Sequence, residues 1–237
     1  MFDVSLPRKL WRLDFGASPP ATLNSQLSTH RVSAVSETIV REYFELHEFL
    51  VRQHRKYISQ TRREEDDDID FFVVNPHPRA QGQVLPFVLA SPDLAGIERA
   101  VVVVKGWHTE TFSTARLTSA PEIFRFVETR VFQQAARAFG EEGTPLKILV
   151  VPALPHDPHA RLESIALLRS KGIDAIIPFQ TMLADLVRET EVNRNYQKSD
   201  LFQMIRILKN YDFFKEPQLE LFKPKRRRKA KANPKSE

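Results

Sequence analysis

Apolar residues recur along this chain in two kinds of spacing, which together predict an α/β protein. Residues 32–50 predict a helix, because apolar side chains recur there every three or four positions. These side chains are Val35, Ile39, Val40, Tyr43, Phe44 and Leu46. Either Ser33 or Ser36 can cap the start of this helix. Segments 49–58 and 69–76 are instead short and rich in β-branched or aromatic residues, which predicts two strands.

The rest of the body predicts a regular succession of strands and helices. Residues 100–105, Ala-Val-Val-Val-Val-Lys, predict a buried strand, and so do segments 146–155 and 173–179. The remaining helical patterns cover 121–139, 159–172, 181–192 and 199–211. The predicted order is therefore helix, three strands, helix, strand, helix, strand and two helices, without an internal repeat.

The chain predicts one folded domain between two irregular ends. Residues 1–31 combine prolines, glycine and many Ser/Thr without a sustained period, which predicts an irregular arm. Residues 32–215 hold the predicted elements, and residues 216–237 predict a disordered tail because they are rich in Pro and Lys. The net charge of +5 is concentrated in this tail: residues 223–237 carry +7, which leaves −2 for the other 222 residues.

Composition also indicates a compartment. The chain has no cysteine, which excludes disulfides and thiolate zinc sites and favours a reducing environment. No apolar run approaches the ~18 residues that a membrane span needs. We therefore expect a cytoplasmic protein without membrane association.

Three charged residues stand at informative places in this order. Asp70 opens the second predicted strand, Lys105 ends the third, and Glu37 lies early in the first helix. Across residues 32–155 the element order and these residues resemble the restriction-endonuclease-like, or PD-(D/E)xK, nuclease superfamily. The resemblance implies a mixed central sheet flanked by helices, with Asp70, Lys105 and Glu37 as catalytic residues. It also implies that Asp70 and Glu37 bind Mg²⁺ or Mn²⁺ and that the reaction is hydrolysis of a DNA phosphodiester.

One position departs from the superfamily pattern. An acid is expected two residues before the lysine, and this chain has Val103 there. Because a strand alternates its faces, Val103 and Lys105 should point the same way, toward where a metal would be held. Three interpretations stay open: Glu37 replaces the missing acid in a working enzyme, the site is inactive in a fold kept for binding DNA, or Asp70 and Lys105 form a structural ion pair.

Residues 218–222, Gln-Leu-Glu-Leu-Phe, form a second motif. They resemble the short peptide by which bacterial DNA polymerases and repair factors bind the replication sliding clamp. In such a peptide Gln218 would enter a polar pocket, while Leu219, Leu221 and Phe222 would fill an apolar groove. The alternative is a helix end whose apolar residues fold back on the domain.

Two further features predict contact with nucleic acid. The basic run that contains Arg226, Arg227, Arg228 and Lys229 can neutralise phosphates without sequence preference, although RNA, an anionic membrane, nuclear import or mere solubility would explain it too. Trp107 can stack on bases, unless it packs against a neighbouring helix. The sequence thus favours a DNA-associated nuclease-fold protein of repair, replication or restriction that the sliding clamp recruits. The alternatives are a non-catalytic DNA-binding adaptor and an interaction protein whose basic tail binds RNA.

Overall fold

The structure is a computed structural model that describes residues 33–53, 69–79, 84–140 and 143–214. The chain divides into two compact units, 1–31 and 32–237, and all described residues belong to the second. The predicted arm at 1–31, the Gln-Leu-Glu-Leu-Phe motif and the basic run all lie outside the described residues.

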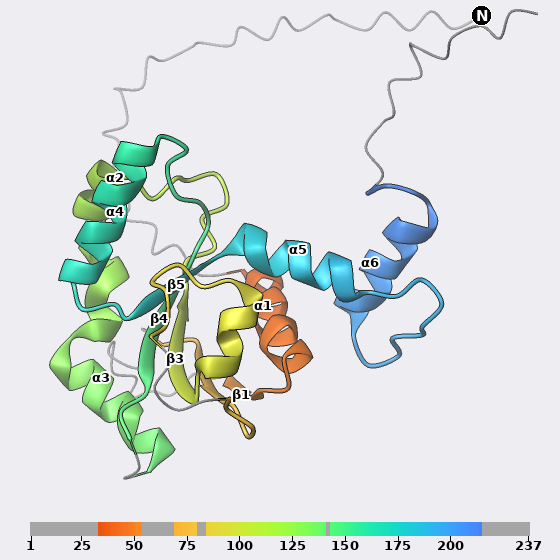
Figure 1. The fold of residues 1–237 in the computed structure, drawn as a ribbon, viewed down its shortest axis with the longest axis horizontal. Helices are drawn as coiled ribbons and strands as arrows, with labels where there is room; N and C mark the ends of the chain where they lie inside the picture. Colours follow the sequence, from red (N-terminus) through yellow and green to blue (C-terminus); the bar gives the residue numbers. More distant parts are fainter. Residues whose placement is uncertain (1–32, 54–68, 80–83, 141–142, 215–237) are drawn as a thin grey trace, which may run out of the picture. The chain divides into compact units, whose positions relative to one another are not determined.

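The described strands form one mixed, five-stranded sheet with the spatial order β1-β2-β3-β4-β5 (Figure 1). β1 (Leu50–Gln53), β2 (Phe71–Val74) and β3 (Arg99–Val104) make an antiparallel meander. β4 (Leu146–Val151) and β5 (Ala175–Pro178) continue the sheet in parallel with β3. The predicted α/β class and its mixed sheet are confirmed.

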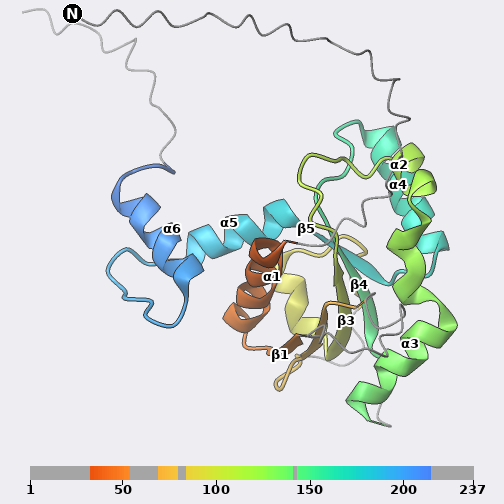
Figure 2. The same ribbon diagram turned by 180° about the vertical axis from the view of Figure 1, so that it is seen from behind.

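Helices cover both faces of this sheet (Figures 1 and 2). One face packs against α1 (Ala34–Leu46), the 3₁₀ segment η2 (Ser91–Gly96) and α5 (Phe179–Glu189). α6 (Asp200–Asn210) packs against α1 on the side away from the sheet (Figure 1). The other face packs against α2 (Thr114–Ser119), the 3₁₀ segment η3 (Pro121–Val127), α3 (Thr129–Ala136) and α4 (Pro158–Ser170). None of the described helices is long and apolar enough to cross a membrane.

The valine run of β3 supplies both cores. Val102 and Val104 pack in the core beside α1, whereas Val101 and Val103 pack in the core on the opposite face. All four side chains are at most 1% exposed. A strand that is covered on both faces needs apolar residues at every position, which explains why these valines do not alternate with polar residues.

One predicted helix was wrong. Residues 121–139 are not one helix, because η3 and α3 are separated by the extended backbone of Glu128, and a last 3₁₀ turn, η4 (Arg137–Phe139), follows. The break lets η3 and α3 each turn their apolar residues into the same core. Residues 114–119, for which the sequence analysis predicted no element, form α2, whose start is capped by the Ser113 hydroxyl, which accepts the N–H of Arg116 at 3.3 Å.

Candidate functional site

One edge of the sheet gathers the residues that the sequence singled out. Gln53 ends β1, Asp70 directly precedes β2, and Lys105 directly follows β3. These positions lie at one edge because each of the three strands runs antiparallel to its neighbour. The same edge holds the carboxyl ends of β4 and β5, so we call it the carboxyl edge.

Asp70 is anchored to β3 by its backbone and its side chain. Its N–H donates to the carbonyl of Val102 at 3.2 Å, and its Oδ2 accepts the N–H of Val104 at 2.7 Å. The residue is only 6% exposed. Since Phe71 pairs with Val102, extending the antiparallel register by one residue places Asp70 opposite Val103. Cross-strand partners share a face, so a carboxylate at position 103 would lie beside that of Asp70.

Lys105 continues the pairing of β3 with β4. Its N–H donates to the carbonyl of Val150 at 3.0 Å, and the residue is half-buried. Lys105 therefore lies at the carboxyl edge, directly after Val104, whose N–H donates to Asp70. The buried valines fix the position of β3, and Lys105 is the first residue after them whose side chain is not fully buried.

Glu37 reaches the carboxyl edge from the first turn of α1. Its Oε2 accepts a hydrogen bond from Gln53 Nε2 at 2.6 Å, which joins the helix to the end of β1. Gln53 was not among the residues that the sequence singled out. Its position at the end of a strand was visible, but nothing in the local pattern indicates a partner on another element.

Gly106 allows the start of α1 to approach the loop after β3. A Cβ atom at this position would lie 2.6 Å from Ser36 Oγ and 3.1 Å from Ser36 Cβ, closer than side chains pack. The helix itself begins at Ser33, whose hydroxyl accepts the N–H of Ser36 at 3.2 Å. Close contact at Gly106 thus brings the turn that carries Glu37 next to the residue that follows Lys105.

His108 adds a second link between this loop and α1. Its Nε2 lies 3.0 Å from Ser36 Oγ, and Ser36 Oγ lies 3.0 Å from Ser33 Oγ. The imidazole also packs edge-to-face on Phe179, the first residue of α5, with 4.5 Å between ring centroids. The sequence suggested His108 only as a possible lining of a DNA groove and gave no sign of this serine–histidine contact.

Trp107 belongs to the core, which corrects its prediction as a base-stacking residue. The residue is 9% exposed, and its ring packs edge-to-face on Phe112 with 5.7 Å between centroids. The guanidinium of Arg116 lies 4.7 Å from the centre of the ring. Little of the indole is left to stack on a base, so we exclude Trp107 from the candidate site.

The charged side chains of the carboxyl edge are few. Within the described ranges, no group of three or more His, Asp or Glu side chains is arranged to hold a metal ion. Asp70 and Glu37 supply one carboxylate each, and Val103 supplies none. The predicted clamp-binding and DNA-binding residues at 218–222 and 226–229 lie outside the described residues.

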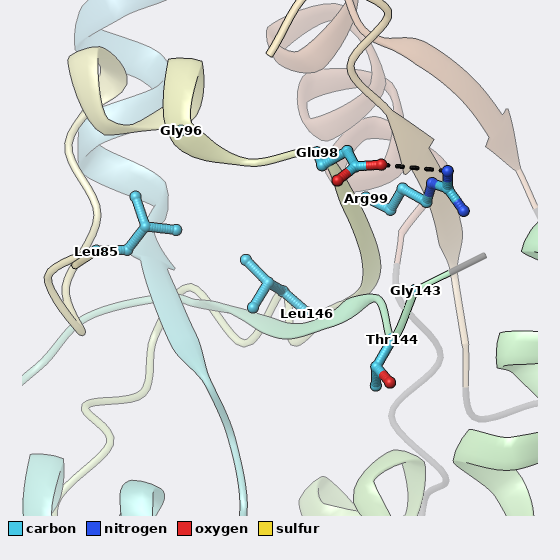
Figure 3. Close-up of a pocket in the computed structure, with 7 residues that line it drawn as sticks. All are labelled: Leu85, Gly96, Glu98, Arg99, Gly143, Thr144 and Leu146. Carbon is cyan, nitrogen blue, oxygen red and sulfur yellow. Dashed lines mark ion pairs between the residues drawn. The ribbon is translucent and has the colours of Figure 1, made fainter. Parts of the chain in front are cut away.

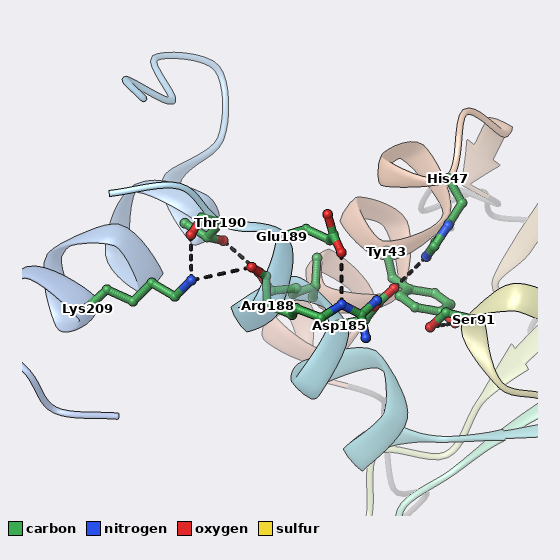
Figure 4. A network of polar contacts seen from close by, with 9 residues as sticks. Tyr43, His47, Ser91, Asp185, Arg188, Glu189, Thr190 and Lys209 are labelled. Carbon is green, nitrogen blue, oxygen red and sulfur yellow. Dashed lines mark hydrogen bonds and ion pairs between the residues drawn. The ribbon is translucent and has the colours of Figure 1, made fainter. Parts of the chain in front are cut away.

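A separate polar network joins α1 to α5 away from this edge (Figure 4). His47 Nε2 and Asp185 Oδ2 are 2.6 Å apart, and Asp185, which is 1% exposed, also pairs with Arg188. Burial lowers the pKa of His47, while Glu189 raises it and Arg188 lowers it further. A neutral His47 that donates Nε2–H to the carboxylate fits this environment.

Tyr43 extends the same network toward η2. Its hydroxyl lies 3.0 Å from Ser91 Oγ, and burial raises the pKa of Tyr43 to about 12 despite this hydrogen bond. The phenol is therefore neutral at any physiological pH. The sequence predicted Tyr43 as a core residue, which is confirmed, but gave no sign of the hydrogen bond.

A surface pocket lies at the opposite edge of the sheet (Figure 3). It measures about 200 Å³ and opens beside the first residues of β3 and β4. Its lining consists of Leu85, Gly96, Glu98, Arg99, Gly143, Thr144 and Leu146. Arg99 is paired with Glu98 at 3.1 Å, so the pocket lacks a set of converging catalytic groups.

Comparison of the chain with protein-family models, with curated proteins and with solved structures finds no match.

Proposed function

We propose that this chain is a DNA-associated protein with a restriction-endonuclease-like core, which contacts the phosphodiester backbone at the carboxyl edge. The observation that carries the proposal is that Glu37, Asp70 and Lys105 all stand at this edge of the sheet. Three different elements supply these residues, and the contacts of Gln53 and Val104 hold the two acids there. In such a site Lys105 would stabilise negative charge that develops on a phosphate.

The two acids fit a hard divalent cation. Mg²⁺ and Mn²⁺ prefer oxygen ligands, and Mg²⁺ commonly uses one or two carboxylates while it keeps several waters. Asp70 and Glu37 are the residues that would hold the ion. When bound, such an ion supplies charge neutralisation at the phosphate under attack. Activity would make the protein a phosphodiester hydrolase that acts in the cytoplasm in repair, replication or restriction.

A non-catalytic DNA-binding adaptor is the second candidate. It is favoured by Val103, which is 1% exposed where the superfamily pattern has an acid. With two carboxylates in place of three, binding of a metal is weaker. The same edge could then bind a phosphate through Lys105 without hydrolysing it.

Cleavage assays with isosteric variants distinguish these two functions. Plasmid and branched DNA are incubated with Mg²⁺ or Mn²⁺ and with wild-type protein or Asp70→Asn. The asparagine keeps an oxygen that can accept the N–H of Val104 but removes the charge, so the fold is preserved while metal binding is lost. An enzyme loses cleavage by orders of magnitude in Asp70→Asn, and an adaptor binds DNA without cleaving it. Absence of both cleavage and DNA binding in the wild type would refute the proposal.

The proposal includes two separate partners for the C-terminal segment: a sliding clamp for residues 218–222 and DNA for residues 223–237. Leu221→Ala together with Phe222→Ala removes apolar anchors, which typically carry most of the binding energy of a peptide. We expect this double variant to lose binding to a bacterial sliding clamp in calorimetry while it keeps its affinity for DNA. Deletion of 223–237 should do the reverse and flatten the salt dependence of DNA binding, because fewer counterions are released.

Each half of that experiment has its own contrary result. A wild-type protein that does not bind the clamp would remove the clamp as a partner. An unchanged salt dependence after deletion of 223–237 would mean that the basic run does not contact phosphates.

A further inference from the structure

The imidazole of His108 is oriented by two tertiary contacts although its side chain is exposed. Nε2 faces the buried hydroxyl of Ser36, and the ring packs edge-to-face on Phe179. The two ring nitrogens lie on different sides of the imidazole, so the contact with Ser36 turns Nδ1 away from α1. Among the described residues none hydrogen-bonds Nδ1.

One arrangement of the two serine hydroxyls places the proton on Nδ1 of His108. Ser33 Oγ already accepts the N–H of Ser36. If Ser33 O–H donates to Ser36 Oγ and Ser36 O–H donates to Nε2, every donor of this short chain has a protein partner. Nε2 is then the acceptor and the proton sits on Nδ1. In this arrangement the ring presents an N–H donor to the solvent side of the carboxyl edge.

The position of this donor relates it to the candidate site. His108 follows Lys105 in a tight turn in which the His108 N–H donates to the carbonyl of Gly106 at 3.0 Å. Ser36 precedes Glu37 on α1. The imidazole thus stands between the element that carries the lysine and the element that carries the helical acid.

We propose that His108 donates Nδ1–H to a phosphate oxygen of bound DNA and that Ser36 is its positioning residue. This inference rests on the proposed function. A phosphate is a strong acceptor, and hydrogen bonds to charged groups are stronger than neutral ones. A strand anchored in this way would run past Lys105 and the two acids.

DNA binding is measured by fluorescence anisotropy with the full chain, without divalent metal, so that cleavage cannot contribute. His108→Ala should weaken binding roughly tenfold or more, the usual effect of losing a hydrogen bond to a charged group. His108→Gln should keep much of the affinity, because an amide can accept from Ser36 and still donate to a phosphate. His77→Ala is the matched control, since His77 is exposed after β2 at the opposite edge of the sheet, and it should bind like the wild type.

Phosphate-ethylation interference separates contact from mere folding. Ethylation removes the charge of single phosphates, and the wild type should show a set of phosphates at which ethylation blocks binding. His108→Ala should lose sensitivity at one site of that set and keep the others, and Ser36→Ala should weaken the same site. A uniform loss at every phosphate, or an unchanged pattern and affinity in His108→Ala, would overturn the inference. A wild type that does not bind DNA would instead refute the proposed function.

Discussion

The burial of Val103 beside Asp70 leads to a prediction about Val103→Glu. A glutamate there must place its carboxyl group in the core, because Val103 is 1% exposed and its cross-strand neighbour is the nearly buried Asp70. A divalent cation shared by the two carboxylates would compensate both charges. The folding of the variant should therefore depend on metal, independently of any catalytic activity.

The size of the change in stability follows from two opposing effects, the cost of burying a carboxyl group and the stabilisation by a bound cation. Burial raises the pKa of such a carboxyl group by several units, each worth about 1.4 kcal/mol, so we expect a loss of about 4–6 kcal/mol without metal. Proteins typically have a free energy of unfolding of about 5–15 kcal/mol, so the folded state of the variant would be only marginally stable. A cation that binds only the folded state, at a concentration of about one hundred times its dissociation constant, stabilises that state by about 2.7 kcal/mol. For a denaturant slope of about 1–3 kcal/mol per molar urea, the urea midpoint should rise by about 1–3 M.

Val101→Glu is the matched control for this effect. Val101 points into the same core and is fully buried, but its cross-strand partner is Phe72 in place of an acid. It should be destabilised to a similar degree and gain nothing from metal. Urea unfolding is followed by circular dichroism in EDTA and in excess Mg²⁺ or Mn²⁺. If a variant is unfolded in EDTA, titration with metal while the far-ultraviolet circular dichroism is recorded reports the same coupling between metal binding and folding.

Equal responses of the two variants to metal would refute the reasoning. They would mean that a carboxylate at position 103 does not form a joint site with Asp70. A response limited to Val103→Glu would support the metal assignment, and we then expect Mg²⁺-dependent DNA cleavage to appear or rise in that variant.

Two other predictions concern the packing of α1. Gly106→Ala should destabilise the protein by about 1–3 kcal/mol, because its Cβ would meet Ser36 Oγ at 2.6 Å; the double variant with Ser36→Ala should cost less than the sum, and additive urea midpoints would contradict this contact. Stability should also fall as the pH drops below about 6.5, because burial lowers the pKa of His47 in the folded state and the unfolded chain therefore binds the proton more readily. His47→Gln should flatten this loss between about pH 7 and pH 5, and an unchanged pH dependence of its urea midpoint would show that another group is responsible.

Some of the candidate site could be predicted from sequence because it depends on local patterns. Asp70 and Lys105 flank short apolar strands, and consecutive strands commonly pair as an antiparallel meander. The start of one strand and the end of the next then meet at one edge. The periodicity of residues 32–50 likewise indicated the helix that carries Glu37.

Other parts of the site depend on docking between distant elements, for which the sequence carries no local signal. The Ser36–His108 contact joins residues 72 positions apart. Gln53 looked like any residue at a strand end until the position of Glu37 was known. Trp107 was misjudged for a related reason: an aromatic residue in a loop can face solvent or the core, and only the packing of Phe112 and Arg116 decides which.

Valine at position 103, where the proposed superfamily pattern has an acid, has a structural logic if the carboxyl edge is the functional site. An apolar side chain that is fully buried contributes about 1.5–3 kcal/mol, whereas a buried carboxylate costs free energy unless it is compensated. Valine at this position therefore strengthens the core between β3 and α2. Glu37 on α1 lies instead at a half-buried helix start, where Gln53 orients it by a hydrogen bond. The ability of the edge to bind DNA or metal then depends less on β3 than on how closely α1 packs on Gly106. Substitutions at that contact should therefore change DNA binding, even though Gly106 itself carries no functional group.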